Sequence, residues 1–130
     1  MTVRRNDTHS TEFGLWLREQ DEIDSSLGFV ATNLDFVWCN YKLNKYMLIE
    51  EKRYNSMPKL CQQLMFKRID DACKNDPRYC GFYYLIFENT SPDDGLINLF
   101  GDVMNLQIKH TVISNSDFLR FLRFEYNPFR

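Results

Sequence analysis

Three ionisable side chains at the ends of two strand-like segments have the types and spacing that could do chemistry. Asp35 lies among apolar residues in TNLDFVW, and Glu50 and Lys52 end the segment YMLIEEK. Side chains alternate between the two faces of a strand, so Glu50 and Lys52 point to one face and Glu51 points to the other. Charges at the edge of a core are costly unless a partner compensates them. The sequence therefore raises the question of which group pairs with Glu50.

A β-hairpin would bring Asp35 to Glu50. The polar segment NYKLNK separates the two strands, and a turn centred near residues 42 and 43 places Asp35 opposite Glu50. Two converging carboxylates suit Mg²⁺ or Mn²⁺, which take oxygen ligands and also bind substrate phosphates. A lysine beside them can orient or deprotonate water, or stabilise the charge of a transition state. The simpler alternative is a strand that ends in solvent, with Asp35 in a turn.

Three helices are expected from caps and apolar periodicity. The first begins at a Ser10 cap and fades near Asp24. The second has Asn55 or Ser56 as its cap and an apolar stripe that includes Leu60, Leu64 and Ile69. The third is short and closes the chain. These helices are predicted at 10–24, at 57–74 and from a cap at Ser116.

Strands are predicted between these helices. The apolar and aromatic segment 79–89 is expected to be a central strand that is buried on both faces. One or two further strands follow the SPDDG turn at 91–95. The two strands of the hairpin and the later strands are predicted within 27–40, 46–52, 96–100 and 105–114.

The order α-β-β-α-β-β-α indicates an α/β or α+β fold with a central mixed sheet flanked by helices. The chain has 130 residues and is 44% hydrophobic, which suits one domain with a sizeable core. We expect a flexible N-terminus at 1–10 and a single domain at 11–130.

Composition argues against several classes of protein. The net charge of −2 is not typical of a nucleic-acid binder, although residues 42–78 hold nine basic residues against five acidic ones. A solvated helix face is the simpler explanation of that local charge. The four cysteines lack metal-type spacing, and only two histidines are present. With no signal peptide and no apolar run long enough for a membrane span, we expect reduced, buried thiols in a cytoplasmic protein.

An acid on one strand and E-x-K on the next, flanked by helices, resembles the PD-(D/E)XK nuclease superfamily, which has the restriction-endonuclease-like fold. The resemblance covers residues 12 to about 88. It implies a metal-dependent endonuclease in which Asp35 and Glu50 bind Mg²⁺ or Mn²⁺ and Lys52 assists the attacking water. Two positions depart from the pattern, since Leu34 replaces proline and Glu51 replaces an apolar residue.

The resemblance also implies supporting residues. A glutamate of the first helix, Glu19 or Glu12, could help hold the metal, and Gln62 or Gln63 could join the site from the second helix. Phosphate contacts to DNA are expected from basic residues that flank the site in sequence, namely Lys42, Lys45, Arg53, Lys59 and Lys67.

We therefore expect a hydrolase that cuts DNA, with low sequence specificity or a structure-selective substrate, and a possible homodimer. The small size would fit a viral or mobile-element protein, which would act in the host cytoplasm. Two alternatives remain open. One is an RNA-directed nuclease on the same fold, and the other is a non-enzymatic module that binds a protein partner, such as a viral or mobile-element inhibitor.

Overall fold

The computed structural model of the protein describes residues 11–130, so the predicted flexible segment 1–10 and the predicted Ser10 cap lie outside the described residues. The chain divides into two compact units. One ends at Asn33, and the other is Leu34–Arg130.

The described part of the unit that ends at Asn33 contains one short α-helix, α1 (Glu12–Arg18). Two 3-10 helices follow it, η2 (Asp21–Ile23) and η3 (Ser25–Leu27). The prediction that the first helix extends to near Asp24 is wrong. The Asp24 carboxylate accepts hydrogen bonds from the Ser26 N–H and hydroxyl, and such local bonds compete with a continuous helix.

The second unit is built on a five-stranded mixed sheet with the order β1-β2-β3-β4-β5. Only β2 and β3 are parallel, and every other neighbouring pair is antiparallel. This confirms an α+β fold with a mixed sheet, and both of the strands expected after the SPDDG turn are present. The strands are β1 (Phe36–Asn40), β2 (Lys45–Lys52), β3 (Tyr79–Phe87), β4 (Ile97–Phe100) and β5 (His110–Ile113).

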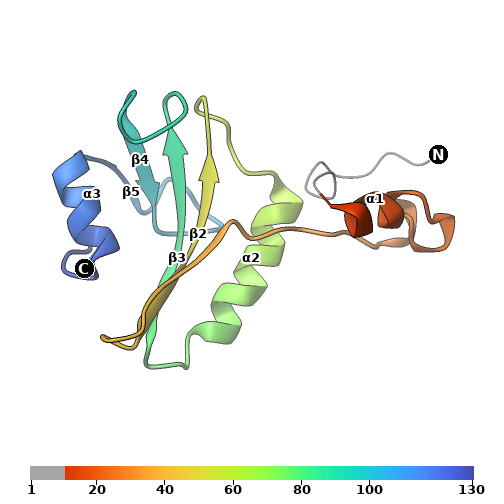
Figure 1. Ribbon diagram of the computed structural model, residues 1–130, viewed down its shortest axis with the longest axis horizontal. Helices are drawn as coiled ribbons and strands as arrows, with labels where there is room; N and C mark the ends of the chain where they lie inside the picture. The colour runs from red at the N-terminus through yellow and green to blue at the C-terminus, as the bar shows by residue number, and fades with distance from the viewer. Residues whose placement is uncertain (1–10) are drawn as a thin grey trace. The chain divides into compact units, whose positions relative to one another are not determined.

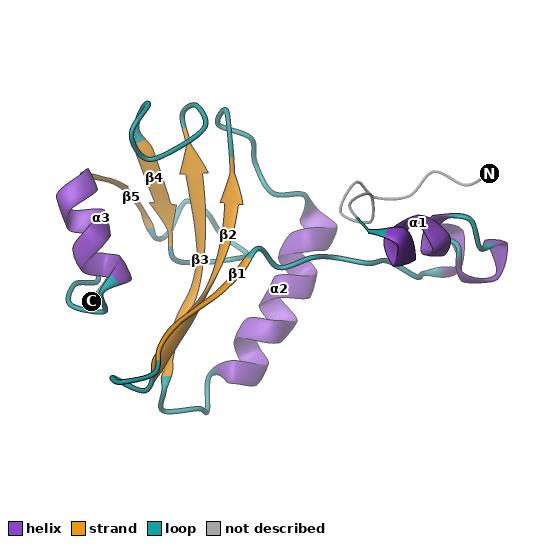
Figure 2. Cartoon of the chain, viewed as in Figure 1, coloured by secondary structure: helices purple, strands orange, loops and turns teal. Residues whose placement is uncertain are grey.

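Two helices cover the two faces of this sheet, as Figure 1 shows. α2 (Leu60–Cys73) packs on one face, where Phe66 joins a cluster with Leu48 and Tyr84. α3 (Asn115–Leu122) packs on the other face through Phe118 and Phe121. Figure 2 shows α2 as the connection between the parallel strands β2 and β3. Side chains from both faces of β3 are buried, which confirms the predicted central strand.

The first predicted strand is shorter than expected, because only Phe36–Asn40 of the segment 27–40 forms a strand. Backbone pairing with β2 begins at Phe36, because the hydrogen bonds between Asp35 and β2 run through side chains. A strand needs a neighbour to satisfy its backbone groups, so apolar composition alone did not extend it.

The predicted buried stripe of α2 is also wrong. Leu60, Leu64 and Ile69 are 65%, 48% and 37% exposed, whereas Phe66 is 1% exposed. The helix begins at Leu60 after Lys59, not near Asn55 or Ser56. Its inner face places the half-buried Gln62 beside the sheet, so polarity is a poor guide to burial here.

Two smaller expectations need correction. The cap of α3 is Ser114, whose hydroxyl accepts the Asp117 N–H at 3.2 Å, and Ser116 lies within the helix. The four cysteines are free, as expected, but none is buried. Cys39 and Cys61 are exposed, and Cys73 and Cys80 are half-buried.

Candidate active site

The hairpin of β1 and β2 brings Asp35 to Glu50. Phe36 pairs with Ile49, so Asp35, just before β1, lies beside Glu50 near the end of β2. The Asp35 N–H donates to Glu50 Oε1 at 3.1 Å, and the Glu51 N–H donates to Asp35 Oδ2 at 3.0 Å. Each carboxylate therefore accepts a hydrogen bond from the backbone of the opposite segment. The register expected from the turn is confirmed.

Glu50 is the buried charged residue of this unit, at 3% exposure. Carboxylates are rarely buried without partners. Gln62 Nε2 donates to Glu50 Oε2 at 3.0 Å, and Lys52 Nζ lies 3.6 Å from the same oxygen. The Lys52 side chain keeps 23% exposure, so its ammonium group lies at the boundary between the core and solvent.

The site holds more negative charge than its own cations compensate. Burial, and next the nearby charge of Asp35, raise the pKa of Glu50 from 4.5 to about 7, although Lys52 opposes the shift. A carboxylate in this state favours a further positive charge, which a proton or a divalent cation can supply. The donor set therefore fits Mg²⁺ or Mn²⁺.

The number of protein ligands is small. Within residues 11–130, no group of three His, Cys, Asp or Glu side chains is placed to hold a metal ion. Mg²⁺ is commonly bound by one or two carboxylates, with water and substrate phosphate as its other ligands. Asp35 and Glu50 together would supply the two carboxylates of such a site.

Tyr84 lies beside the candidate site, although the sequence predicted only that its segment, 79–89, is a buried central strand. It pairs with Glu50 across the parallel strands and is 0% exposed. Its hydroxyl is buried and has no hydrogen-bond partner among the described residues. Burial, followed by the charge of Glu50, raises the pKa of Tyr84, so the phenol stays protonated. The strand register is the signal that would have found it.

Glu51 and Arg53 lie next to the site but do not enter it. Glu51 points to the face opposite Glu50, as the alternation of β2 requires. Its carboxylate pairs with Arg53 at 3.2 Å, and the Arg53 side chain is 57% exposed. Arg53 therefore remains available at the surface beside the end of β2.

The structure separates some residues that were expected near the site. Lys42 lies in the β1–β2 turn and Lys45 begins β2, at the end of the hairpin away from Glu50. Five residues of strand between Lys45 and Glu50 correspond to about 16 Å. Glu12 and Glu19 belong to the unit that ends at Asn33, so their contribution to a metal site stays a prediction.

The residues predicted in α2 and just before it also differ in whether they lie near Glu50. Gln62 contacts Glu50, and Lys59 precedes the helix by one residue. The Gln63 backbone N–H donates a hydrogen bond to the Lys59 carbonyl. Lys67 is further along the helix and pairs with Asp71 at 2.7 Å.

Comparison with known proteins finds no matching protein family, no matching curated protein and no matching solved structure. In the described part of the chain, no helix has the length and apolar character needed to cross a membrane.

Proposed function

We propose that the chain is a metal-dependent endonuclease of the PD-(D/E)XK type that hydrolyses phosphodiester bonds of DNA. The observation that carries the proposal is the convergence of Asp35, Glu50 and Lys52 at one end of the β1–β2 hairpin. The chain order α1, β1, β2, α2, β3, with α2 linking two parallel strands, supports the restriction-endonuclease-like arrangement.

Asp35 and Glu50 would hold Mg²⁺ or Mn²⁺ through their carboxylate oxygens. When bound, such a cation offsets phosphate charge and lowers the pKa of water. Lys52 would donate to a phosphate oxygen or to the attacking water, because its ammonium is beside Glu50 and partly exposed. Gln62 fixes the Glu50 carboxylate through its amide.

The test is a cleavage assay on supercoiled plasmid, single-stranded DNA, a four-way junction and RNA, each with Mg²⁺, Mn²⁺ or EDTA. Glu50→Ala and Lys52→Ala should each reduce metal-dependent cleavage by at least about 100-fold. Glu51→Ala and Arg78→Ala are matched controls, because Glu51 points to the opposite face of β2 and Arg78 pairs with Asp76 beside the start of that strand. Both should stay within a few-fold of the wild type.

The same assay separates the alternatives. Cleavage of RNA alone would identify the RNA-directed nuclease. If folded wild-type protein cuts none of the substrates, the endonuclease proposal fails and the protein-binding module becomes the better explanation. Equal loss of activity in Glu50→Ala and Glu51→Ala would also contradict the proposed site.

A further inference from the structure

The first half of β3 has an open edge. β4 pairs with β3 only from Tyr84 to Phe87, and no described strand pairs with residues 79–83 on that side. After β4 the chain turns away at Gly101, whose N–H donates to the Lys109 carbonyl at 2.9 Å. An open strand edge presents backbone groups that a ligand can reach.

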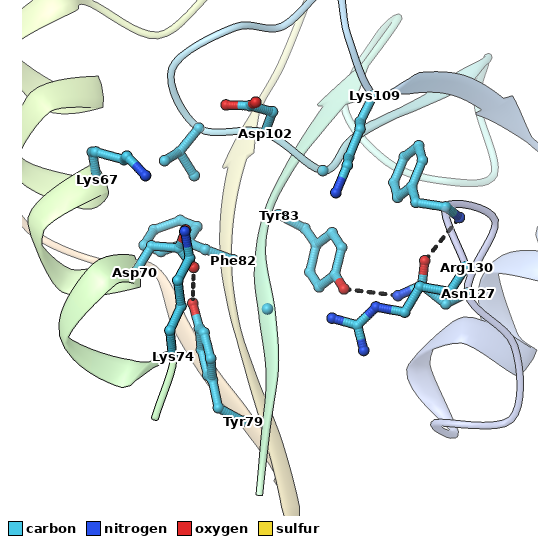
Figure 3. Close-up of a pocket in the computed structure, with 14 residues that line it drawn as sticks. Lys67, Asp70, Lys74, Tyr79, Phe82, Tyr83, Asp102, Lys109, Asn127 and Arg130 are labelled. Atoms are coloured by element: carbon cyan, nitrogen blue, oxygen red, sulfur yellow. Dashed lines mark hydrogen bonds and ion pairs between the residues drawn. The ribbon is translucent and has the colours of Figure 1, made fainter. Parts of the chain in front are cut away.

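A cavity of about 250 Å³ lies at this edge, and we call it the edge pocket. In Figure 3, Lys67 of α2 and Lys74, the C-cap of α2, approach it from one side of β3, and Lys109 and Arg130 approach it from the other side. Four cationic side chains from three separate segments thus border one small space. Asp70 and Asp102 are the acidic residues of its lining.

Both acidic residues already have partners. Asp70 accepts the Tyr79 hydroxyl at 2.5 Å and lies 3.6 Å from Lys74 Nζ. Asp102 accepts two backbone N–H groups of its own loop, from Met104 and Asn105. The two carboxylates offset two of the four cations of the lining, so a net positive charge remains at the edge pocket.

Lys109 and Arg130 provide that net positive charge. Among residues 11–130, neither side chain forms an ion pair, whereas Lys67 and Lys74 share Asp71. Unpaired cations at a small concave site attract anions, because the surrounding protein focuses their field.

The floor of the edge pocket is fixed by Tyr83 and Gly81. The Tyr83 hydroxyl donates to the Cys80 carbonyl at 2.5 Å and accepts from Asn127 Nδ2 at 2.8 Å, which ties the C-terminal segment to β3. Gly81 has φ of +117°, and a Cβ there would lie 2.7 Å from the Tyr83 hydroxyl. Glycine is therefore needed for the tyrosine to fold back along the strand.

We infer that the edge pocket binds one phosphate group through Lys109 and Arg130, with Lys67 and Lys74 at its rim. The volume is below the usual range for a drug-sized ligand, which favours a single small anionic group. Asp35, Glu50 and Lys52 do not line the pocket, so it is distinct from the carboxylate site. If the proposed endonuclease function holds, the group is a backbone phosphate away from the scissile bond.

The test uses the full chain, labelled with ¹⁵N and titrated with inorganic phosphate against sodium chloride of equal ionic strength. Saturable shifts are expected at the Gly81, Gly101 and Lys109 amides. Lys109→Gln/Arg130→Gln should weaken phosphate binding at least ten-fold. The control Arg68→Gln/Arg123→Gln removes the same charge from residues outside the pocket lining and should leave binding unchanged.

The spectrum of each variant also reports whether it folds, and Lys109→Gln alone replaces the double variant if that variant unfolds. Absence of saturable shifts, or equal weakening in the control, would overturn the inference. These measurements do not depend on cleavage, so the phosphate site and the proposed endonuclease function are tested independently.

A second arm identifies the source of the phosphate. Binding of a DNA duplex is measured in EDTA at several salt concentrations. A backbone phosphate in the pocket predicts that Lys109→Gln/Arg130→Gln lowers affinity at least ten-fold and reduces the salt slope by about one. An unchanged slope, with phosphate binding lost, would overturn the DNA assignment and support free phosphate or a mononucleotide.

Discussion

Glu50 combines deep burial with incomplete compensation of its charge. Its carboxylate accepts bonds from the Asp35 N–H and from Gln62, yet its pKa is raised to about 7. Groups with perturbed pKa values concentrate at functional sites, although structural networks also perturb them. In the metal-free protein, Glu50 is therefore expected to weaken the fold at neutral pH.

The free energy of unfolding in EDTA is expected to fall as the pH rises from about 4.5 to about 7. In this window the folded state keeps the Glu50 proton that the unfolded chain has released, so stability declines with pH. The full shift corresponds to at most about 3 kcal/mol. Urea titrations across this range should show the decline, and Glu50→Gln should remove it. Glu51→Gln is the control and should keep the decline. If Glu50→Gln also kept it, the assignment of the decline to Glu50 would be contradicted.

Tyr83 and Tyr84 form a natural pair for a second experiment. Tyr84→Phe removes a buried hydroxyl without a described partner, so stability should change by less than about 0.5 kcal/mol or increase. Tyr83→Phe removes the bonds to Cys80 and Asn127 and should cost about 1–2 kcal/mol. Chemical denaturation of both variants measures the difference. A larger loss in Tyr84→Phe would mean that its hydroxyl has an important partner.

Residue types and spacing predicted the meeting of Asp35 and Glu50, because strand alternation and a short turn fix both positions. They did not predict Tyr84 at the site. That proximity depends on the parallel register of β2 and β3, which are connected through α2 rather than through a short turn. Local sequence does not determine such a register.

At the scale of elements, α2 carries one strong core anchor and a polar contact to the site. Phe66 packs against Phe82 and Tyr84, with ring centroids 4.8 and 6.1 Å away. Gln62, one helical turn earlier, reaches Glu50. Packing by Phe66 therefore also sets the position of Gln62.

Phe66→Ala should cost about 3–5 kcal/mol, because it removes a fully buried aromatic ring and leaves a cavity. Leu60→Ala on the same helix should cost less than about 1 kcal/mol, since Leu60 is 65% exposed. Thermal and urea unfolding of the two variants test the contrast. Similar losses would indicate that the outer face of α2 is also packed.

Strand and helix types were predictable where apolar patterns are strong, as in β2 and β3. Their ends were not, since they depend on partners. β1 begins only at Phe36, because the bonds between Asp35 and β2 run through side chains. α1 ends at Arg18, and Asp24 caps the second of the two 3-10 helices that follow it. The buried face of α2 was misassigned because the side toward the site carries polar residues.

At the scale of the whole molecule, addition of Mg²⁺ should stabilise the fold. A cation that binds only the folded state, present at ten times its Kd, contributes about 1.4 kcal/mol. This corresponds to a rise in Tm of about 4–7 °C for a domain of this size. Differential scanning calorimetry with and without Mg²⁺ measures it. Glu51→Gln should keep the rise, and an equal rise in Glu50→Gln would argue against a cation at this site.

Overall composition predicted a sizeable core and the order of helices and strands predicted a mixed sheet, but a net charge of −2 concealed the local concentration of cations. Lys67 and Lys74 are close in sequence, whereas Lys109 and Arg130 join them only through the fold. Sequence patterns therefore could not predict the edge pocket. The predicted single domain at 11–130 and the possible homodimer stay predictions.

Every side chain of the candidate active site lies within the continuous stretch 35–84, which comprises β1, β2, α2 and the first part of β3. The chain after Phe87 contributes packing but no group to that site. The loop at 88–96 is thus a natural place for insertions during evolution, and the segment before Leu34 is another. If the proposed endonuclease function holds, the groups that carry its chemistry form one continuous segment, and the rest of the chain can vary without removing any of them.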